Sequence, residues 1–310
     1  MRLVILTECG KGIGSGHLAR CLALSQGFLE RGFEVLFVVN AVEPAPGIPG
    51  SLEVFRCAWH VPEGQQAALD LVRGADLLVV DSYLAPQPCY AALAGAAKRM
   101  VCLDDNARVE YPRGWVVNGG VDAGMLDYRR CSGVHYLLGP EFTALRRSFW
   151  DIRPRAVSPE VRRVLVTFGG GDSRQMAPRV ARHLQEAFPA WGIDVVNGCS
   201  SEAQMCSLMR QADMAVSSAG QTLYELACCG VAAVGVCVAG NQRLNVQGWT
   251  QAGYLEYAGG ADDPDILENI LKNVRRLLPY EVREARAAAG QGKVDGQGVR
   301  RIVAEVLKGL

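Results

Sequence analysis

The sequence lacks several features that would place it in a common class of protein. It has no run of about 18 apolar residues, so a membrane span is not expected. Lysine and arginine (32) balance aspartate and glutamate (32), and neither half of the chain has the basic excess of a nucleic-acid-binding protein. The P-loop string GxxxxGK[ST] is also absent. We therefore expect no membrane span, no nucleic-acid partner and no P-loop nucleotide site.

Cysteine is not scarce, but its arrangement disfavours two common uses of cysteine. The chain has 11 cysteines, an odd number, and no CxxC pair occurs. A disulfide framework and a zinc site are therefore both disfavoured. The N-terminal segment MRLVILTECGKG has a short apolar run with glycines directly after it, unlike a signal peptide. We expect reduced, mostly buried thiols in a cytoplasmic protein without a metal site.

Short apolar runs alternate with helical patterns, and this alternation starts twice in the 310 residues. Strands are predicted over 2–7, 34–39, 76–81, 100–104, 115–118, 161–168, 193–196, 213–217 and 231–238. Helices are predicted over 17–31, 65–73, 86–98, about 174–188, 201–211, 221–229 and within a final helical region at about 264–309. The charged, proline-containing segment 140–160 is typical of a domain boundary. This order predicts two α/β domains, each with a parallel sheet covered by helices.

Glycine is concentrated at three strand-to-helix turns, over 10–16, 169–173 and 217–222. Such turns let a ligand approach the backbone, and they present amide N–H groups and the positive end of a helix dipole. The window GIGSGH (12–17) has histidine where the dinucleotide fingerprint needs glycine, and the second strand ends without an acid. The three turns predict a nucleotide or sugar-phosphate ligand and disfavour a nicotinamide cofactor.

Histidine is scarce, and His17 alone among the four lies in a glycine-lined turn at the carboxyl end of a strand. The dipole of the helix that follows disfavours imidazolium, so a neutral imidazole at this position could act as a general base. The alternative is a histidine that caps the turn or packs against the sheet.

Several motifs resemble, in the same order, those of a known family of nucleotide-sugar hydrolases. GIGSGHLARCLAL (12–24) resembles the N-terminal loop of the UDP-2,4-diacetamido-2,4,6-trideoxy-β-L-altropyranose hydrolase family, which makes the precursor of pseudaminic acid. The later blocks are VVDSY (79–83), LDDNAR (103–108), LLGPEFTALRRSF (137–149), VTFGGGDSRQM (166–176) and SSAGQTLYELACCGVAAVGVCVAGNQRLN (217–245). The resemblance covers about residues 1–260. The GxGH loop alone is shared more loosely with GT-B glycosyltransferases such as the one that makes lipid II.

This resemblance implies an α/β fold of the GT-B type, with two Rossmann-like, doubly wound domains and an interdomain cleft. A first domain over 1–150 would carry the catalytic histidine and the sugar site, and a second over 158–310 would bind the nucleotide diphosphate. The implied reaction is attack of water on the anomeric carbon of a UDP-sugar, with inversion, release of UDP and no metal or other cofactor. We expect the protein to be a monomer.

The expected site residues fall into three groups. His17, Tyr83 and Asn241 match catalytic positions of the family. The residues expected at the sugar are Gly14, Gly16, Asp104, Asp105 and Gln242. Those expected at the nucleotide are Gly169, Gly170, Gly171, Asp172, Ser218, Gly220, Gln221, Thr222 and Glu225, the last as the acid that contacts the ribose.

Structural alternatives exist for several of these positions. Glu225 lies three positions after Thr222, as in a capping box. Tyr83 could be an ordinary interface aromatic, AGNQR a simple turn, and the two aspartates a solvated turn with a capping residue.

The function has alternatives as well. One is a GT-B glycosyltransferase that transfers a similar sugar to an acceptor, and another is a non-catalytic nucleotide-sugar-binding protein. The Pro-rich stretch 40–62 and the C-terminal 50 residues carry no recognisable motif, which leaves room for a different sugar or a CMP-linked one.

Overall fold

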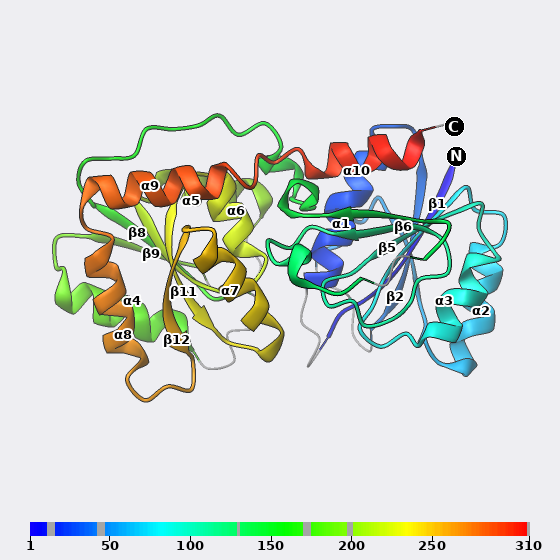
Figure 1. Ribbon diagram of the computed structural model, residues 1–310, viewed down its shortest axis with the longest axis horizontal. Helices are drawn as coiled ribbons and strands as arrows, with labels where there is room; N and C mark the ends of the chain where they lie inside the picture. The colour runs from blue at the N-terminus through cyan, green and yellow to red at the C-terminus, as the bar shows by residue number, and fades with distance from the viewer. Residues whose placement is uncertain (11–15, 42–46, 129–130, 170–174, 197–200, 309–310) are drawn as a thin grey trace. The chain divides into compact units, whose positions relative to one another are not determined.

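The computed structural model describes residues 1–10, 16–41, 47–128, 131–169, 175–196 and 201–308. The chain forms two compact units (Figure 1). The first contains Met1–Arg146 and Gln297–Leu310, and the second contains Arg147–Gly296. Each unit is a parallel sheet with helices packed on it.

The first unit has a seven-stranded sheet in the order β3-β2-β1-β4-β5-β6-β7. Its strands are β1 Arg2–Glu8, β2 Glu34–Asn40, β3 Glu53–Arg56, β4 Leu77–Asp81, β5 Arg99–Leu103, β6 Gly114–Asn118 and β7 Val134–Leu138. The helices that connect them are α1 Gly16–Leu29, α2 Pro62–Val72 and α3 Gln87–Ala94. The strand order reverses direction between β1 and β4, which is where ligands of doubly wound sheets bind.

The inner strands form because most of their residues are apolar on both faces, and the buried polar residues of β1 and β4 lie at the carboxyl ends of these strands. All five residues of β4 are buried, and so are residues 3–8 of β1, as expected of a parallel sheet covered on both sides. Residues 3–6 of β1 pair with residues 77–80 of β4. This register places the carboxyl ends of the two strands side by side, at the start of the segment that leads to α1.

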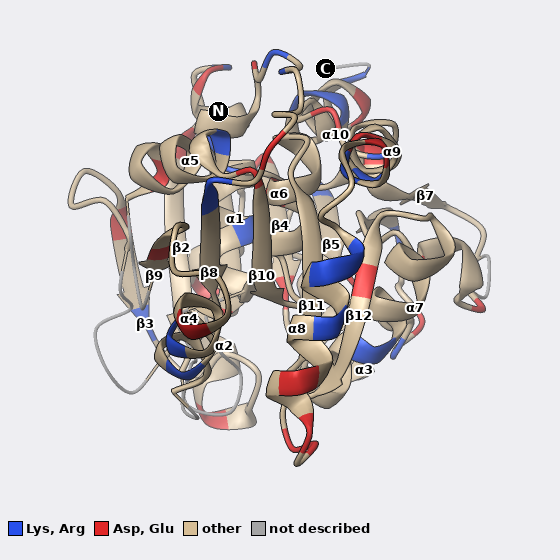
Figure 2. Cartoon of the chain, turned by 90° about the vertical axis from the view of Figure 1, so that its left-hand side faces the viewer, with Lys and Arg blue, Asp and Glu red and all other residues tan. Residues whose placement is uncertain are grey.

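The second unit has a five-stranded parallel sheet in the order β12-β11-β10-β8-β9. Its strands are β8 Arg163–Thr167, β9 Gly192–Val196, β10 Met214–Ser218, β11 Ala232–Cys237 and β12 Leu255–Gly260. Its helices are α4 Met176–Ala187, α5 Glu202–Gln211, α6 Thr222–Cys228, α7 Arg243–Gln251, α8 Ile266–Arg276 and α9 Tyr280–Gln291. Figure 2 shows basic and acidic residues next to one another along α4 and α8.

Within the described ranges, no helix combines the length and the apolar character that a transmembrane segment needs.

The C-terminal helix differs from the expected domain organisation. The helical region predicted at 264–309 is three helices, and the last of them, α10 Gly298–Leu307, belongs to the first unit. It packs against α1, as Figure 1 shows at its red end. Arg99 of β5 caps it, because Nη1 donates to the carbonyl oxygens of Val306 (2.6 Å) and Lys308 (3.2 Å). The expected second domain over 158–310 is therefore too long, since its last residues return to the first unit.

One buried arginine ties the end of α8 to the irregular segment before β8. The Arg283 side chain is fully buried, and its guanidinium donates to the carbonyl oxygens of Leu277 (2.9 Å), Ser158 (2.7 Å) and Pro159 (3.0 Å). A further bond goes to the carbonyl of Leu278. These four carbonyls have no helical or sheet partner in this arrangement, so the guanidinium takes the place of water.

The Arg283→Met variant is expected to unfold more easily than the wild type. Methionine fills the space of the side-chain stem but leaves the carbonyls without donors, which should cost about 2–4 kcal/mol of unfolding free energy. Urea denaturation checks this, with Arg182→Met as the matched control, because Arg182 is exposed on α4. Equal denaturation midpoints for the two variants would contradict the tethering role.

Candidate active site

His17 lies at the point where the strand order of the first unit reverses. It is the second residue of α1, which follows β1, and its side chain is buried. Gly16 begins α1, and a Cβ added there would meet no protein atom within 4 Å. Packing within the described residues therefore does not require glycine at this position. Gly14 lies outside the described residues.

His17 is paired with Asp81, the last residue of β4. Its Nδ1 lies 2.5 Å from Oδ1 of Asp81, which is fully buried. Arg20 bonds the same carboxylate twice, from Nε to Oδ2 and from Nη2 to Oδ1, both at 2.6 Å. Burial alone would raise the pKa of Asp81, but the charge of Arg20 and the hydrogen bonds from Arg20 and His17 outweigh it and hold that pKa well below its ordinary value.

This pairing fixes the tautomer of the imidazole. An ionised carboxylate can only accept hydrogen bonds, so Nδ1 of His17 must carry the hydrogen that lies between it and Asp81. In the neutral ring, Nε2 then has a lone pair, and no hydrogen bond to it is recorded among the described residues. Arg20 Nη2 also lies 3.2 Å from Nδ1, but its hydrogen goes to the closer carboxylate oxygen at 2.6 Å. The arrangement can take a proton at Nε2.

Tyr83 and Asp105 stand beside this pair. The Tyr83 ring meets the His17 ring edge-on, with centroids 4.2 Å apart at an angle of 87°. Its hydroxyl donates to Oδ2 of Asp105 at 2.5 Å, and Arg20 Nη1 reaches the same oxygen at 3.1 Å. Oδ1 of Asp105 is buried and has no hydrogen-bond partner in the described structure. Its capacity to accept a hydrogen bond is thus not used by the described residues.

A buried glutamate holds the backbone of Tyr83 in place. Glu8 ends β1, and its carboxylate accepts from the Ser82 hydroxyl (2.7 Å) and the Tyr83 backbone N–H (2.6 Å). The Ser82 hydroxyl in turn accepts from the backbone N–H groups of Leu84 and Ala85, both at 2.9 Å. Neither Glu8 nor Ser82 was expected from the sequence, although both lie at the carboxyl ends of predicted strands.

Asp104 is used differently from its neighbour. Its carboxylate accepts from the backbone N–H groups of Asn106 (3.3 Å) and Ala107 (2.9 Å) and from the Tyr128 hydroxyl (2.8 Å). Ala107 has a left-handed backbone with φ of 51°, a conformation that these bonds help to stabilise. The structure thus favours the capping alternative for Asp104, whereas Asp105 faces the histidine pair.

The nucleotide residues expected in the second unit follow β8 and β10, which are neighbours in its sheet. Gly169 lies two residues after the end of β8 and has φ of +73°, a left-handed conformation that favours glycine. Gly170, Gly171 and Asp172 lie outside the described residues. Ser218 ends β10, Gly220 and Gln221 follow it, and Thr222 begins α6. Gln221 is the N-cap residue of α6 and makes no capping bond with its side chain, and Glu225 is buried on this helix.

The AGNQR segment forms a one-turn 3₁₀ helix, Gly240–Gln242, after β11. Asn241 is exposed there, while Oε1 of Gln242 accepts from the Val238 backbone N–H at 2.9 Å. Gln242 thus braces its own loop. A residue that sequence reasoning missed, Asn245 on α7, donates to the carbonyl oxygen of Ala219 at 2.6 Å and fixes the turn after β10.

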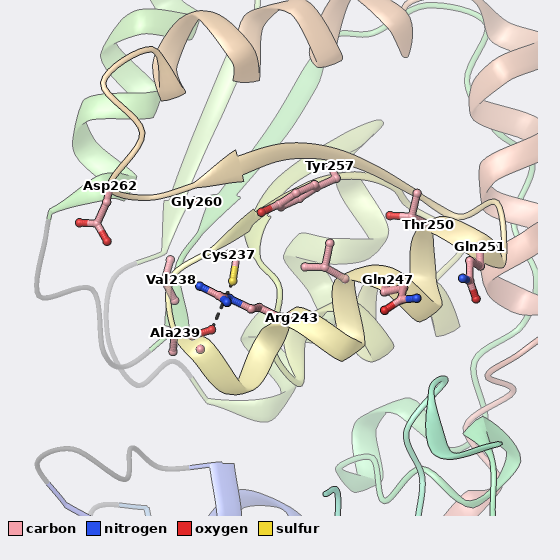
Figure 3. A pocket seen from close by; sticks show the side chains of 12 residues that line it. Cys237, Val238, Ala239, Arg243, Gln247, Thr250, Gln251, Tyr257, Gly260 and Asp262 are labelled. Atoms are coloured by element: carbon pink, nitrogen blue, oxygen red, sulfur yellow. Dashed lines mark hydrogen bonds between the residues drawn. The ribbon is translucent and has the colours of Figure 1, made fainter. Parts of the chain in front are cut away.

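A pocket of about 810 Å³ lies in the second unit beside this segment. Figure 3 shows Arg243 of α7 and Tyr257 of β12 on its walls, with the thiol of Cys237 near the guanidinium. Among the described residues, none of those expected at the nucleotide lines it. Over the described part of the chain, no group of three or more His, Cys, Asp or Glu side chains could hold a metal ion.

Comparisons with known proteins agree with the resemblance seen in the motifs. No family model matches the chain. The pseudaminic acid cytidylyltransferase and UDP-2,4-diacetamido-2,4,6-trideoxy-beta-L-altropyranose hydrolase of Helicobacter pylori is 25% identical over 271 residues, 83% of this chain and 48% of that protein. The chain therefore spans about half the length of this relative. The spore coat polysaccharide biosynthesis protein SpsG of Bacillus subtilis is 25% identical over 345 residues, 98% of this chain and 97% of that protein.

Solved structures with a similar fold include enzymes of the GT-B type. MurG of Acinetobacter baumannii matches with a TM-score of 0.68 at 13% identity, covering 99% of this chain and 100% of that one. MnaA of Staphylococcus aureus, whose structure was determined with UDP, matches with a TM-score of 0.64 at 10% identity, covering 99% and 98%. The predicted fold class, two Rossmann-like, doubly wound units of the GT-B type, is confirmed, and the resemblance to the hydrolase family is confirmed by the sequence relatives.

Proposed function

We propose that this protein hydrolyses a UDP-activated 2,4-diacetamido-2,4,6-trideoxy sugar at its anomeric carbon, with inversion. The products would be UDP and a free sugar for the synthesis of a pseudaminic-type nonulosonic acid. The observation that carries the proposal is the buried His17–Asp81 pair at the reversal point of the first sheet, with Nε2 of the imidazole left to accept a proton. The name and the extent of similarity of the Helicobacter pylori relative supply the substrate class.

In the proposed reaction, Nε2 of His17 removes a proton from a water molecule as its oxygen attacks the anomeric carbon. The bond from that carbon to the diphosphate oxygen breaks, and the electron pair leaves with UDP. Because the attacking water and the leaving group lie on opposite faces of the sugar ring, the configuration inverts. Asp81 stabilises the imidazolium that forms, since its carboxylate already accepts from Nδ1.

We assign the sugar to residues of the first unit and the nucleotide to residues of the second. The free Oδ1 of Asp105 would accept a hydrogen bond from a sugar hydroxyl or acetamido N–H, while Tyr83 forms a wall next to His17. The glycine-rich turn that starts at Gly169 and the turn after Ser218 would surround the diphosphate. Backbone amides can stabilise the spread charge of a leaving diphosphate, so the proposal needs no metal ion.

The test is incubation of the purified protein, with EDTA and without acceptor, with a panel of UDP- and CMP-activated 2,4-diacetamido sugars. The anomeric proton of the product is followed by NMR. We expect release of UDP and a free sugar of inverted configuration.

Turnover that begins only when an acceptor is added would instead identify a glycosyltransferase. Nucleotide-sugar binding without turnover under every condition would identify a binding protein. Loss of activity in EDTA with recovery on adding a divalent cation would contradict the metal-independent reaction.

A further inference from the structure

We infer that Arg20 is a positioning residue for this reaction, which joins the His17–Asp81 pair and the Tyr83–Asp105 pair into one unit and sets the charge around the imidazole. The role of Arg20 in the reaction rests on the proposed function. The contacts that Arg20 makes do not depend on it.

Arg20 is placed for this role by the helix that carries the histidine. It lies three residues after His17 on α1, and side chains at that spacing share one face of a helix. Its guanidinium contacts both carboxylates at once, Asp81 through Nε and Nη2 at 2.6 Å and Asp105 through Nη1 at 3.1 Å. With 18% of its side chain exposed, it is mostly removed from water. A planar, bidentate donor can fix the plane of the Asp81 carboxylate, and that carboxylate fixes the imidazole.

The charges near His17 come from few groups. Arg20 is positive, Asp81 and Asp105 are negative, and Glu8 lies behind the loop that carries Tyr83. The Tyr83 hydroxyl and the Cys21 thiol, which lies 3.6 Å from Asp81, contribute no charge; burial raises the pKa of Cys21 well above its usual value. One positive and two negative charges therefore contact one another next to a neutral ring. When His17 takes up a proton, this group of charges becomes balanced.

Removing Arg20 should disturb this balance in a defined direction. Two carboxylates would then face the imidazole without their cation, and this would favour the protonated ring. As the pH falls, His17 would therefore become protonated, and stop acting as a base, at a higher pH than in the wild type. In the Asp105→Asn variant a negative charge is removed instead, and the ring should lose its proton more easily. The two substitutions are thus expected to shift the titration of His17 in opposite directions.

The experiment compares wild type, Arg20→Gln, Arg20→Lys and Asp105→Asn. In Arg20→Gln, we expect the acid limb of the kcat–pH profile to move up by about one to two pH units. The plateau should fall by about 10- to 100-fold with little change in KM, because the base is misplaced but the substrate contacts remain. In Arg20→Lys, the acid limb should return near the wild-type position while kcat stays low, because an ammonium group supplies the charge but not the fork of donors.

The titration of His17 is also followed by NMR in the free protein, which needs no substrate. Arg31→Gln is the matched control, because Arg31 is exposed beyond the end of α1. If no sugar of the panel is hydrolysed, the proposed function fails, yet the NMR shifts still test the role of Arg20. If Arg20→Gln does not fold, the inference is tested by kcat in Arg20→Lys and by the titration of His17 in Asp105→Asn.

The inference would be overturned if His17 titrated at the same pH in Arg20→Gln, or in Asp105→Asn, as it does in the wild type. So would a rise in KM with unchanged kcat in the Arg20 variants, which would make Arg20 a substrate-binding residue. Full recovery of kcat in Arg20→Lys would overturn the positioning role, since charge alone would then suffice.

Discussion

Asparagine in place of Asp81 is expected to lower the rate of hydrolysis by about 10³- to 10⁴-fold. Arg20 still needs an acceptor, so the side-chain oxygen of the asparagine would turn toward it and the amide NH₂ toward His17. Nδ1 of His17 would then have to accept, and the ring hydrogen would move to Nε2. The imidazole would keep its place but lose the lone pair that takes the proton from water.

The same substitution is expected to lower the unfolding free energy by about 3 kcal/mol, because it removes the charge that compensates a mostly buried guanidinium. Activity should therefore be measured well below the unfolding transition, with the folded fraction checked by circular dichroism. Asp70→Asn on the exposed face of α2 is the matched control, since Asp70 is 54% exposed. Hydrolysis by Asp81→Asn within tenfold of wild type would show that the tautomer of His17 does not limit the reaction.

The sequence predicted the buried strands well, but of the edge strands in the described sheets it predicted β9 and missed β3, β7 and β12. Residues 77–81 are all buried and 77–80 form a continuous apolar run, so the predicted strand at 76–81 nearly coincides with β4. β3 and β7 lie at the two edges of the first sheet and are half exposed. Half-exposed edge strands mix polar with apolar residues, so their pattern did not stand out from the loops around them.

The candidate site could be predicted only in part, for a similar reason. His17 stands out because histidine is scarce and this one follows a glycine-rich turn. Asp81 was within a recognised motif, but its role depends on β1 and β4 being neighbours, a contact across 64 residues that no local pattern reveals. Arg20 could have been found, because a position three residues after His17 on a predicted helix shares its face. Asp104 and Asp105 are adjacent and alike in chemistry, and only their hydrogen bonds distinguish them.

Asparagine in place of His17 is expected to remove the base and little else. The side chain is shorter, polar and neutral, and its amide NH₂ could still donate to Asp81, so the buried carboxylate would keep one of its partners. We expect kcat to fall by about 10²- to 10⁴-fold, the range that general-base catalysis supplies. Calorimetric titration of UDP should give an unchanged affinity, because the nucleotide is assigned to residues of the second unit.

For His17→Asn, the acid limb of the pH profile tests the role of the imidazole more directly than the fall in kcat does. With the imidazole gone, the small remaining rate should no longer fall in the range where histidine titrates, and it should rise only where hydroxide becomes the nucleophile. His183→Asn is the matched control, because His183 lies on α4 in the second unit and contacts Glu268 at 3.1 Å. Normal turnover by His17→Asn with UDP still bound would exclude His17 as the base. Since no other histidine among the described residues contacts Asp81, such a result would move the search for the base to Asp105, which accepts from the Tyr83 hydroxyl through Oδ2 and whose Oδ1 has no partner among the described residues.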